Sequence, residues 1–245
     1  MSLEKGWNNL PFKNITLTLD DFPSSLKIVQ LSDLHITPKV NLHHLEEMVE
    51  QINQINPDLV LFSGDILQSA AHKVQKQLES FRSLRAKSYY VTGNHDIVYG
   101  AKNLQIIMQE SGVELLDNTI VHLDIQGVKL QLAGLGDRYS FMRGINRDTK
   151  KLFASLHPEL PTILLAHQPK DVSLIGESRV DLQLSGHTHG GQIYPFSLLV
   201  KLAQPYFSGV YKHNKTTLYV NNGIGYWGVQ IRYKAPREIA VLTIN

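Results

Sequence analysis

The chain has 245 residues, 42% hydrophobic and 19% charged, which is the balance of a globular protein rather than a disordered or fibrous one. Its formal net charge of +2 gives no broad basic character, so we expect no nucleic-acid partner. The chain has no cysteine, which excludes disulfides, thiolate nucleophiles and cysteine-ligated zinc, so any metal must bind nitrogen and oxygen atoms.

We find no membrane-spanning or export signal in the sequence. No uninterrupted apolar run reaches the roughly 20 residues needed to span a bilayer, and the N-terminus has no apolar core of a signal peptide. The start at Met1 is also compatible with the loss of a preceding leader or anchor. The sequence leaves the compartment open, and we favour the cytoplasm or a membrane-associated face over secretion.

The first part of the chain has the pattern of a βαβ unit. Residues 26–31 are a short apolar run that predicts a buried strand. Apolar residues then recur at helical spacing over residues 42–55, after Asn41 as a plausible cap and before Pro57 as a stop. A second strand is expected at residues 59–62, and the crossover between the two strands should be right-handed.

The rest of the chain alternates between expected helices and strands. Helices are expected at residues 73–84 and 103–110, and short strands at residues 88–91, 163–166, 182–184, 217–220 and 239–244. The segments at residues 113–116, 119–125 and 128–135 alternate like antiparallel strands. Since we find no repeat, low-complexity tract or linker, we predict one α/β domain over residues 1–245, with two mixed β-sheets packed face to face and flanking helices.

Polar motifs follow the predicted strands, and their joint placement indicates a functional site. Each motif alone occurs by chance in chains of this length, but strand packing would bring all five to one edge, where such folds bind ligands. The glycines in three of them are expected to permit a sharp turn off a strand. The motifs are Asp33-Leu34-His35, Gly64-Asp65, Gly93-Asn94-His95-Asp96, His167 and Gly186-His187-Thr188-His189.

Seven side chains of these motifs form a candidate metal site. They are Asp33, His35, Asp65, Asn94, His167, His187 and His189. This mixture of carboxylate, amide and imidazole suits Mn²⁺, Zn²⁺ or Fe rather than Ca²⁺. Seven ligands are too many for one ion, but with one bridging carboxylate they suit two ions about 3.5–4 Å apart, which activate a water and clamp a phosphoryl group. We therefore expect two divalent metal ions, with Mn²⁺ ranked first.

The ordered motifs resemble those of the calcineurin-like metallophosphoesterase superfamily, D-x-H, G-D, G-N-H-D/E, a single H and G-H-x-H. The resemblance implies a four-layer α/β/β/α fold and attack by a hydroxide that bridges two metal ions, without a covalent intermediate. It places the first ion on Asp33, His35, Asp65 and His189, and the second on Asp65, Asn94, His167 and His187. Asp65 is then the expected bridge. His95 would serve the leaving group or the phosphoryl oxygens, and the adjacent Asp96 would orient its ring.

The sequence around the motifs also bears on the substrate. Residues 66–68 differ from the Asp-Arg-Gly of protein Ser/Thr phosphatases, whereas residues 165–169, 185–192 and 222–225 resemble a bacterial, often membrane-tethered branch. The resemblance implies a phosphodiesterase or pyrophosphatase, with a lipid-linked or nucleotide substrate such as UDP-2,3-diacylglucosamine. The alternatives are a broad-specificity phosphomonoesterase, a cyclic-nucleotide phosphodiesterase and, ranked last because every ligand is present, a non-catalytic scaffold.

A loop at residues 136–147 is a candidate for binding a second phosphate. It carries Arg138, Arg143 and Arg147, whose guanidinium groups suit phosphate geometry. An ordinary solvated connection explains the loop equally well. We expect Asp137 to fix the loop rather than to bind metal.

Residues 195–210 are dense in Phe, Leu and Val and directly follow the last histidine motif. A buried element under the site is slightly favoured. The alternative is an exposed apolar surface that makes peripheral contact with acyl chains or a membrane. Lys201 would then face lipid headgroups, with Trp227, Arg232 and Lys234 beside it.

Overall fold

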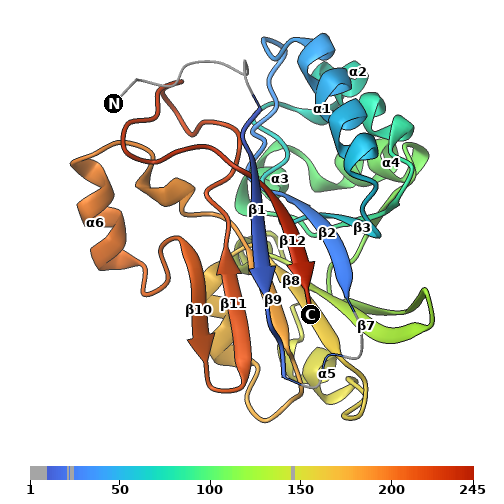
Figure 1. Ribbon diagram of the computed structural model, residues 1–245. Coiled ribbons are helices and arrows are strands. Elements are labelled where there is room, and N and C mark those ends of the chain that lie inside the picture. The colour runs from blue at the N-terminus through green and yellow to red at the C-terminus, as the bar shows by residue number, and fades with distance from the viewer. Residues whose placement is uncertain (1–9, 21, 23–24, 145–146) are drawn as a thin grey trace.

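Two six-stranded β-sheets packed face to face form the centre of the computed structural model, which describes residues 10–20, 22, 25–144 and 147–245 (Figure 1). The first sheet consists, in order, of β1 (Phe12–Leu17), β12 (Ile239–Ile244), β2 (Leu26–Leu31), β3 (Leu59–Phe62), β4 (Lys87–Tyr90) and β5 (Val113–Leu115). The second consists of β10 (Gly209–His213), β11 (Thr216–Val220), β9 (Leu182–Ser185), β8 (Thr162–Ala166), β7 (Val128–Leu135) and β6 (Thr119–Ile125). Both sheets contain parallel and antiparallel pairs, so the predicted fold class is confirmed.

The βαβ unit forms as the sequence predicts. The helix α1 (Leu42–Ile55) begins after Asn41, whose side chain accepts a hydrogen bond from the backbone N–H of His43. The strands on either side, β2 and β3, pair in parallel. The buried face of α1 consists of Leu45, Met48, Val49 and Ile52, the residues that gave the helical spacing.

Apolar side chains on both faces of the strands divide the molecule into four layers. Successive strand residues point to opposite faces, and in β2 Val29 packs toward the helices while Ile28 packs between the sheets. The first sheet is covered by α1, α2 (Gln75–Glu79) and α4 (Ala101–Glu110), and the second by α5 (Thr149–Ala154) and the 3₁₀ segment η4 (Pro169–Leu174). Burial on both faces explains why these strands are continuous apolar runs.

Two expectations about the middle of the chain are wrong. The helix expected at residues 73–84 is three short pieces, η1 (Ala71–Lys73), α2 and η2 (Ser80–Ser83), because Val74 has a non-helical φ of −124°. The strand β5 is parallel to β4, since the chain between them crosses back through α3 (Asn94–Tyr99) and α4. Of the three strands expected to be antiparallel, only β6 and β7 pair in that way.

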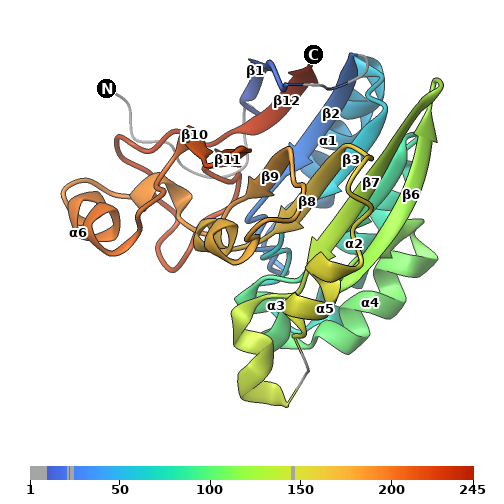
Figure 2. The same ribbon diagram turned by 90° about the horizontal axis from the view of Figure 1, so that it is seen from below.

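One helix lies outside the four layers. In Figures 1 and 2, α6 (Phe196–Ala203) stands apart from both sheets and from the other helices. Within the described part of the chain, no helix combines the length and the apolar character that a membrane span requires. The five polar motifs follow the carboxyl ends of β2, β3, β4, β8 and β9. The candidate site is therefore at that end of the two sheets.

Candidate dinuclear metal site

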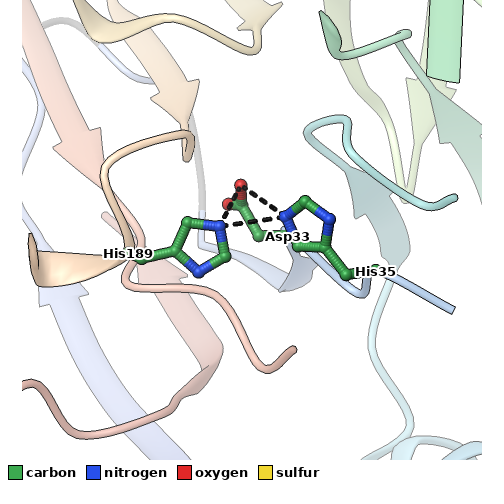
Figure 3. A group of neighbouring side chains, drawn as sticks. All are labelled: Asp33, His35 and His189. Atoms are coloured by element: carbon green, nitrogen blue, oxygen red, sulfur yellow. Dashed lines mark hydrogen bonds and ion pairs between the residues drawn. The ribbon is translucent and has the colours of Figure 1, made fainter. Parts of the chain in front are cut away.

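A first group of candidate ligand atoms is formed by Asp33 and His35, from the loop after β2, and His189, from the loop after β9 (Figure 3). The Nε2 atoms of the two histidines lie 3.0 Å apart. The carboxylate atom Asp33 Oδ1 lies 3.4 Å from His189 Nε2 and 4.0 Å from His35 Nε2. Three ligand atoms therefore point at one small volume, as a metal site requires.

A second group is formed by Asp65, His167 and His187. His187 Nδ1 lies 3.1 Å from His167 Nε2, which in turn lies 3.3 Å from Asp65 Oδ2. The same Asp65 Oδ2 atom is 3.7 Å from His35 Nε2 in the first group. Asp65 therefore lies between the two groups and faces both.

The backbone of the ligand residues is strained. Five non-glycine residues of the two groups have positive φ, a conformation that side chains with a Cβ rarely adopt. They are Asp33 (51°), His35 (45°), Asp65 (54°), His187 (71°) and His189 (53°). Such strain persists only where the surrounding structure enforces it, and its concentration here is typical of a functional site.

Two of the three motif glycines are needed for close packing rather than for a sharp turn of the backbone. Gly64 does have a positive φ of 94°, as a sharp turn requires. A Cβ on Gly93, however, would lie 2.1 Å from Asp65 Oδ1, and a Cβ on Gly186 would lie 2.2 Å from Asp33 Oδ2. Only glycine leaves room at these two positions for the carboxylates, which corrects the expectation that all three provide turns.

Burial and charge set the protonation of the two groups. Burial lowers the pKa of His35 to about 4 and that of His187 to about 3, and it lowers the pKa of His189 well below its usual value. These three imidazoles are therefore neutral near pH 7, the form that binds metal. Burial opposes charge on Asp65 and His167 too, but their mutual attraction lowers the pKa of Asp65 and raises that of His167. The site thus stabilises a positive charge beside Asp65.

Hydrogen bonds fix the orientation of two of the rings. His35 Nδ1 lies 2.7 Å from Gln68 Oε1, and His167 Nδ1 lies 2.8 Å from the Ser63 carbonyl oxygen. Since both partners are acceptors, each ring donates from Nδ1 and leaves Nε2 free as a ligand. No sequence pattern indicates the role of Gln68, because it is 33 positions from His35.

Replacing Gln68 tests this orientation. We expect Gln68→Leu to lower metal affinity about 10–100-fold, because the His35 ring loses the acceptor that fixes its tautomer. Gln68→Glu keeps an acceptor at that position and serves as the matched control. Titration calorimetry with Mn²⁺ measures both affinities, and a Leu variant that binds as tightly as wild type would contradict the assigned role.

Asn94 and His95 begin the helix α3 and face the same site. Asn94 Oδ1 and His95 Nδ1 are buried, yet in the described part of the chain neither has a hydrogen-bond partner. The backbone N–H of His95 donates to Asp65 Oδ1 over 2.8 Å, which ties the start of the helix to the central carboxylate. The unpartnered amide oxygen and the neutral imidazoles fit divalent cations, and both side chains line a common cavity with Asp65.

The expectation that Asp96 orients the His95 ring is wrong. The Asp96 carboxylate accepts hydrogen bonds from the backbone N–H groups of Leu67 and Gly93, both over 2.8 Å. Its side chain thus closes the first turn of α3 and joins it to the loop after β3. Asp96 is a structural residue that holds the helix carrying His95.

The sequence of the chain also matches a known protein family. The family model of calcineurin-like phosphoesterases matches residues 26–191. The chain belongs to this family. The predicted resemblance is therefore confirmed. The family binds divalent metals, and this chain contains groups of Asp and His residues that could hold them.

Three known proteins are similar to the chain, two in sequence and one in fold. A metallophosphoesterase of Helicobacter pylori is 40% identical over 237 residues, which are 95% of this chain but only 63% of that protein. The UDP-2,3-diacylglucosamine pyrophosphatase of Chlamydia muridarum is 27% identical and matches 89% of this chain and 83% of its own length. The NAD nucleotidase of Haemophilus influenzae shares the fold, with a TM-score of 0.57 and 13% identity over 82% of this chain and 46% of its own.

The arginine-bearing loop at residues 136–147 is held by an ion-pair network. Arg138 Nε donates to Asp171 Oδ1 over 2.5 Å, and Arg147 Nη2 donates to the other oxygen of the same carboxylate. Asp137 caps the 3₁₀ segment η3 (Arg138–Arg143), so it fixes the loop as expected. The side chain of Arg143 lies outside what the structure describes. A role in phosphate binding stays a prediction, and two of the three guanidinium groups already share an acidic partner.

Arg232 holds the segment around His189. Its buried guanidinium donates to the carbonyl oxygens of His189, Asn222 and Gly225. Its Nη2 atom also lies 3.0 Å from His189 Nδ1. Arg232 was expected beside the apolar segment, but its contacts make it a positioning residue for a candidate ligand.

The site opens into a cavity of about 260 Å³. Its lining includes the polar side chains of His95, Asn94 and the central Asp65 and the apolar side chains of Phe196 of α6 and Trp227. A substrate in this cavity would meet both candidate ligand groups and apolar side chains. The cavity thus suits a phosphate ester with an apolar part.

Proposed function

We propose that this chain is a dinuclear metal-dependent phosphoesterase that hydrolyses a phosphodiester or pyrophosphate bond, with a lipid-linked substrate favoured. The observation that carries the proposal is the position of Asp65, whose Oδ2 atom is 3.7 Å from His35 Nε2 and 3.3 Å from His167 Nε2. A carboxylate that faces two groups of ligands is what a bridging ligand requires. Family membership supports the same reaction class.

Different residues of the chain have different roles in the proposed reaction. The first group of ligands, with Asp65, would hold one divalent ion, and Asp65, Asn94, His167 and His187 would hold the other. When bound, the two ions supply an activated water and neutralise charge on the phosphoryl oxygens. Asp65 fixes both groups and, through the His95 backbone N–H, also the helix that carries the proposed acid.

His95 is the proposed general acid. A protonated His95 can donate a ring N–H to the leaving oxygen, so that no free alkoxide or unprotonated phosphate has to leave. Its ring edge packs against His35, with 4.6 Å between the ring centroids, and its side chain lines the cavity. The Asp96 cap and the Asp65 contact position it from the backbone, without a side-chain partner for Nδ1 in the described residues.

The substrate proposal rests on the apolar wall of the cavity and on one relative. Phe196, Val200 and Trp227 suit an apolar group next to the phosphate. The Chlamydia muridarum relative is named as a pyrophosphatase of UDP-2,3-diacylglucosamine, which carries both a pyrophosphate and acyl chains. Together they favour a lipid-linked diester or pyrophosphate over a soluble monoester.

A substrate panel with Mn²⁺ tests the proposal. We expect kcat/KM at least about tenfold higher for a phosphodiester or for UDP-2,3-diacylglucosamine than for p-nitrophenyl phosphate, which corresponds to about 1.4 kcal/mol. Asp33→Ala, purified in parallel, controls for contaminating phosphatases. A preference for monoesters or for cyclic nucleotides would contradict the substrate class, and no turnover of any ester by the metal-loaded protein would contradict the enzyme.

A further inference from the structure

The helix α6 exposes an apolar face to solvent. Leu198, Leu199 and Leu202 are exposed to 51%, 61% and 86%. Figures 1 and 2 show the helix projecting from the body of the molecule, with neither sheet against it. The slightly favoured interpretation of this segment, a buried element, is therefore wrong for these leucines. A run of exposed leucines on one short helix is a feature of interaction surfaces.

Aromatic side chains border the exposed face of α6. Tyr194, Phe196 and Trp227 are exposed to between 41% and 50%. Phe196 and Trp227 also line the cavity of the metal site, so the apolar face continues into the site entrance. Tyrosine and tryptophan, whose rings carry one polar group, are typical of the boundary between hydrocarbon and headgroups.

The stretch of chain that carries α6 contains basic residues but no acidic ones. Residues 182–237 contain six Lys and Arg and no Asp or Glu, whereas the whole chain has 24 basic and 22 acidic residues. Within this segment Lys201 lies on α6 itself, and Lys234 lies over the Tyr194 ring at 4.3 Å; both lysines are exposed. Apolar side chains flanked by lysines, without acidic residues, match the surface of an anionic bilayer.

We propose that the α6 face, made of Leu198, Leu199, Leu202 and the flanking Tyr194 and Trp227, is a docking surface for an anionic lipid bilayer. The leucines enter the boundary between headgroups and acyl chains, and Lys201 and Lys234 contact the anionic headgroups. Charge complementarity distinguishes this occupant from a second copy of the chain, whose α6 face would carry the same positive charge.

Docking in this way brings the cavity entrance to the lipid surface. Because Trp227 belongs to the α6 face and also, with Phe196 of the same helix, lines the cavity, a lipid-linked phosphate ester can reach the site without leaving the bilayer completely. This consequence rests on the proposed function. Binding of the bilayer itself does not, because it needs neither metal nor turnover.

Vesicle sedimentation of the full chain tests the docking surface. In EDTA, the wild type should bind vesicles of phosphatidylcholine with 30% phosphatidylglycerol at least about tenfold more tightly than pure phosphatidylcholine vesicles, and salt should weaken the binding. The double variant Leu199→Glu, Leu202→Glu should lose about tenfold or more of this affinity. Ile106→Glu, at a 50% exposed aliphatic residue on α4, is the matched control and should bind as wild type.

Two further measurements separate the alternatives. In a Trp7→Phe background, the emission of Trp227 should shift to shorter wavelength on addition of the anionic vesicles. Asp33→Ala should bind vesicles as wild type does, and the double leucine variant should keep its turnover of a soluble phosphodiester, so failure of docking and failure of catalysis are distinguishable. No binding of wild type to the anionic vesicles, equal losses in Ile106→Glu, or a wild-type dimer that the double variant abolishes would overturn the proposal.

Discussion

His95→Ala is expected to lower kcat by about 10²–10⁴-fold while the metal content stays at the wild-type level. The proposed proton transfer ends with this change, but the two ligand groups are built from other side chains. The contact between the backbone N–H of residue 95 and Asp65 is retained, since it does not involve the replaced side chain.

A comparison of substrates with different leaving groups distinguishes the role of His95 as general acid from a structural role. A diester that releases an alcohol of high pKa should show the full loss, and one that releases p-nitrophenol should show a much smaller loss, because that anion leaves without a proton. His122→Ala, at an exposed histidine on β6, is the matched control. Unchanged turnover of the alkyl diester by His95→Ala would show that His95 is not the acid.

Asp65→Ala is expected to remove both metal ions and essentially all activity, a loss of about 10³-fold or more. The carboxylate faces both ligand groups, so its loss affects both sites at once, unlike the loss of a ligand that belongs to one group. Elemental analysis after Mn²⁺ loading measures the metal content of the variant. Asp20→Ala, at a side chain exposed to 94%, controls for the loss of a carboxylate elsewhere. An Asp65 variant that kept one tightly bound ion would show that the two groups act independently.

The sequence predicted the candidate ligands because each lies just after a strand. Chain direction and strand packing bring such residues to one end of parallel sheets, whichever strands are neighbours. Asp65 and His187, for example, come from different sheets and yet belong to the same group. The position of each motif directly after a strand therefore predicts the site even when the order of the strands in the sheets is unknown.

The role of Asp96 could not be predicted from its place next to His95. Both residues lie in the first turn of α3, and neighbouring residues of a helix point about 100° apart. Asp96 consequently turns toward the backbone of the preceding loop, while His95 lines the cavity. Gln68 and Arg232 were missed for a related reason, since their contacts with His35 and His189 span 33 and 43 positions.

The exposure of α6 could not be predicted from sequence patterns either. A short apolar run has the same composition whether it is buried or projects into solvent, and periodicity does not separate the two. The decisive fact is tertiary, because the four layers are already complete without α6. Its apolar side chains are thus left for another partner.

The number of metal ions bound to the wild-type protein tests the central claim most directly. Crystals grown with Mn²⁺ and measured for anomalous scattering should show two peaks, one within the Asp33, His35 and His189 group and one within the His167 and His187 group, with the Asp65 carboxylate between them. A separation of about 3.5–4 Å is expected for a bridged pair. A single peak in protein loaded with excess Mn²⁺ would contradict the dinuclear site.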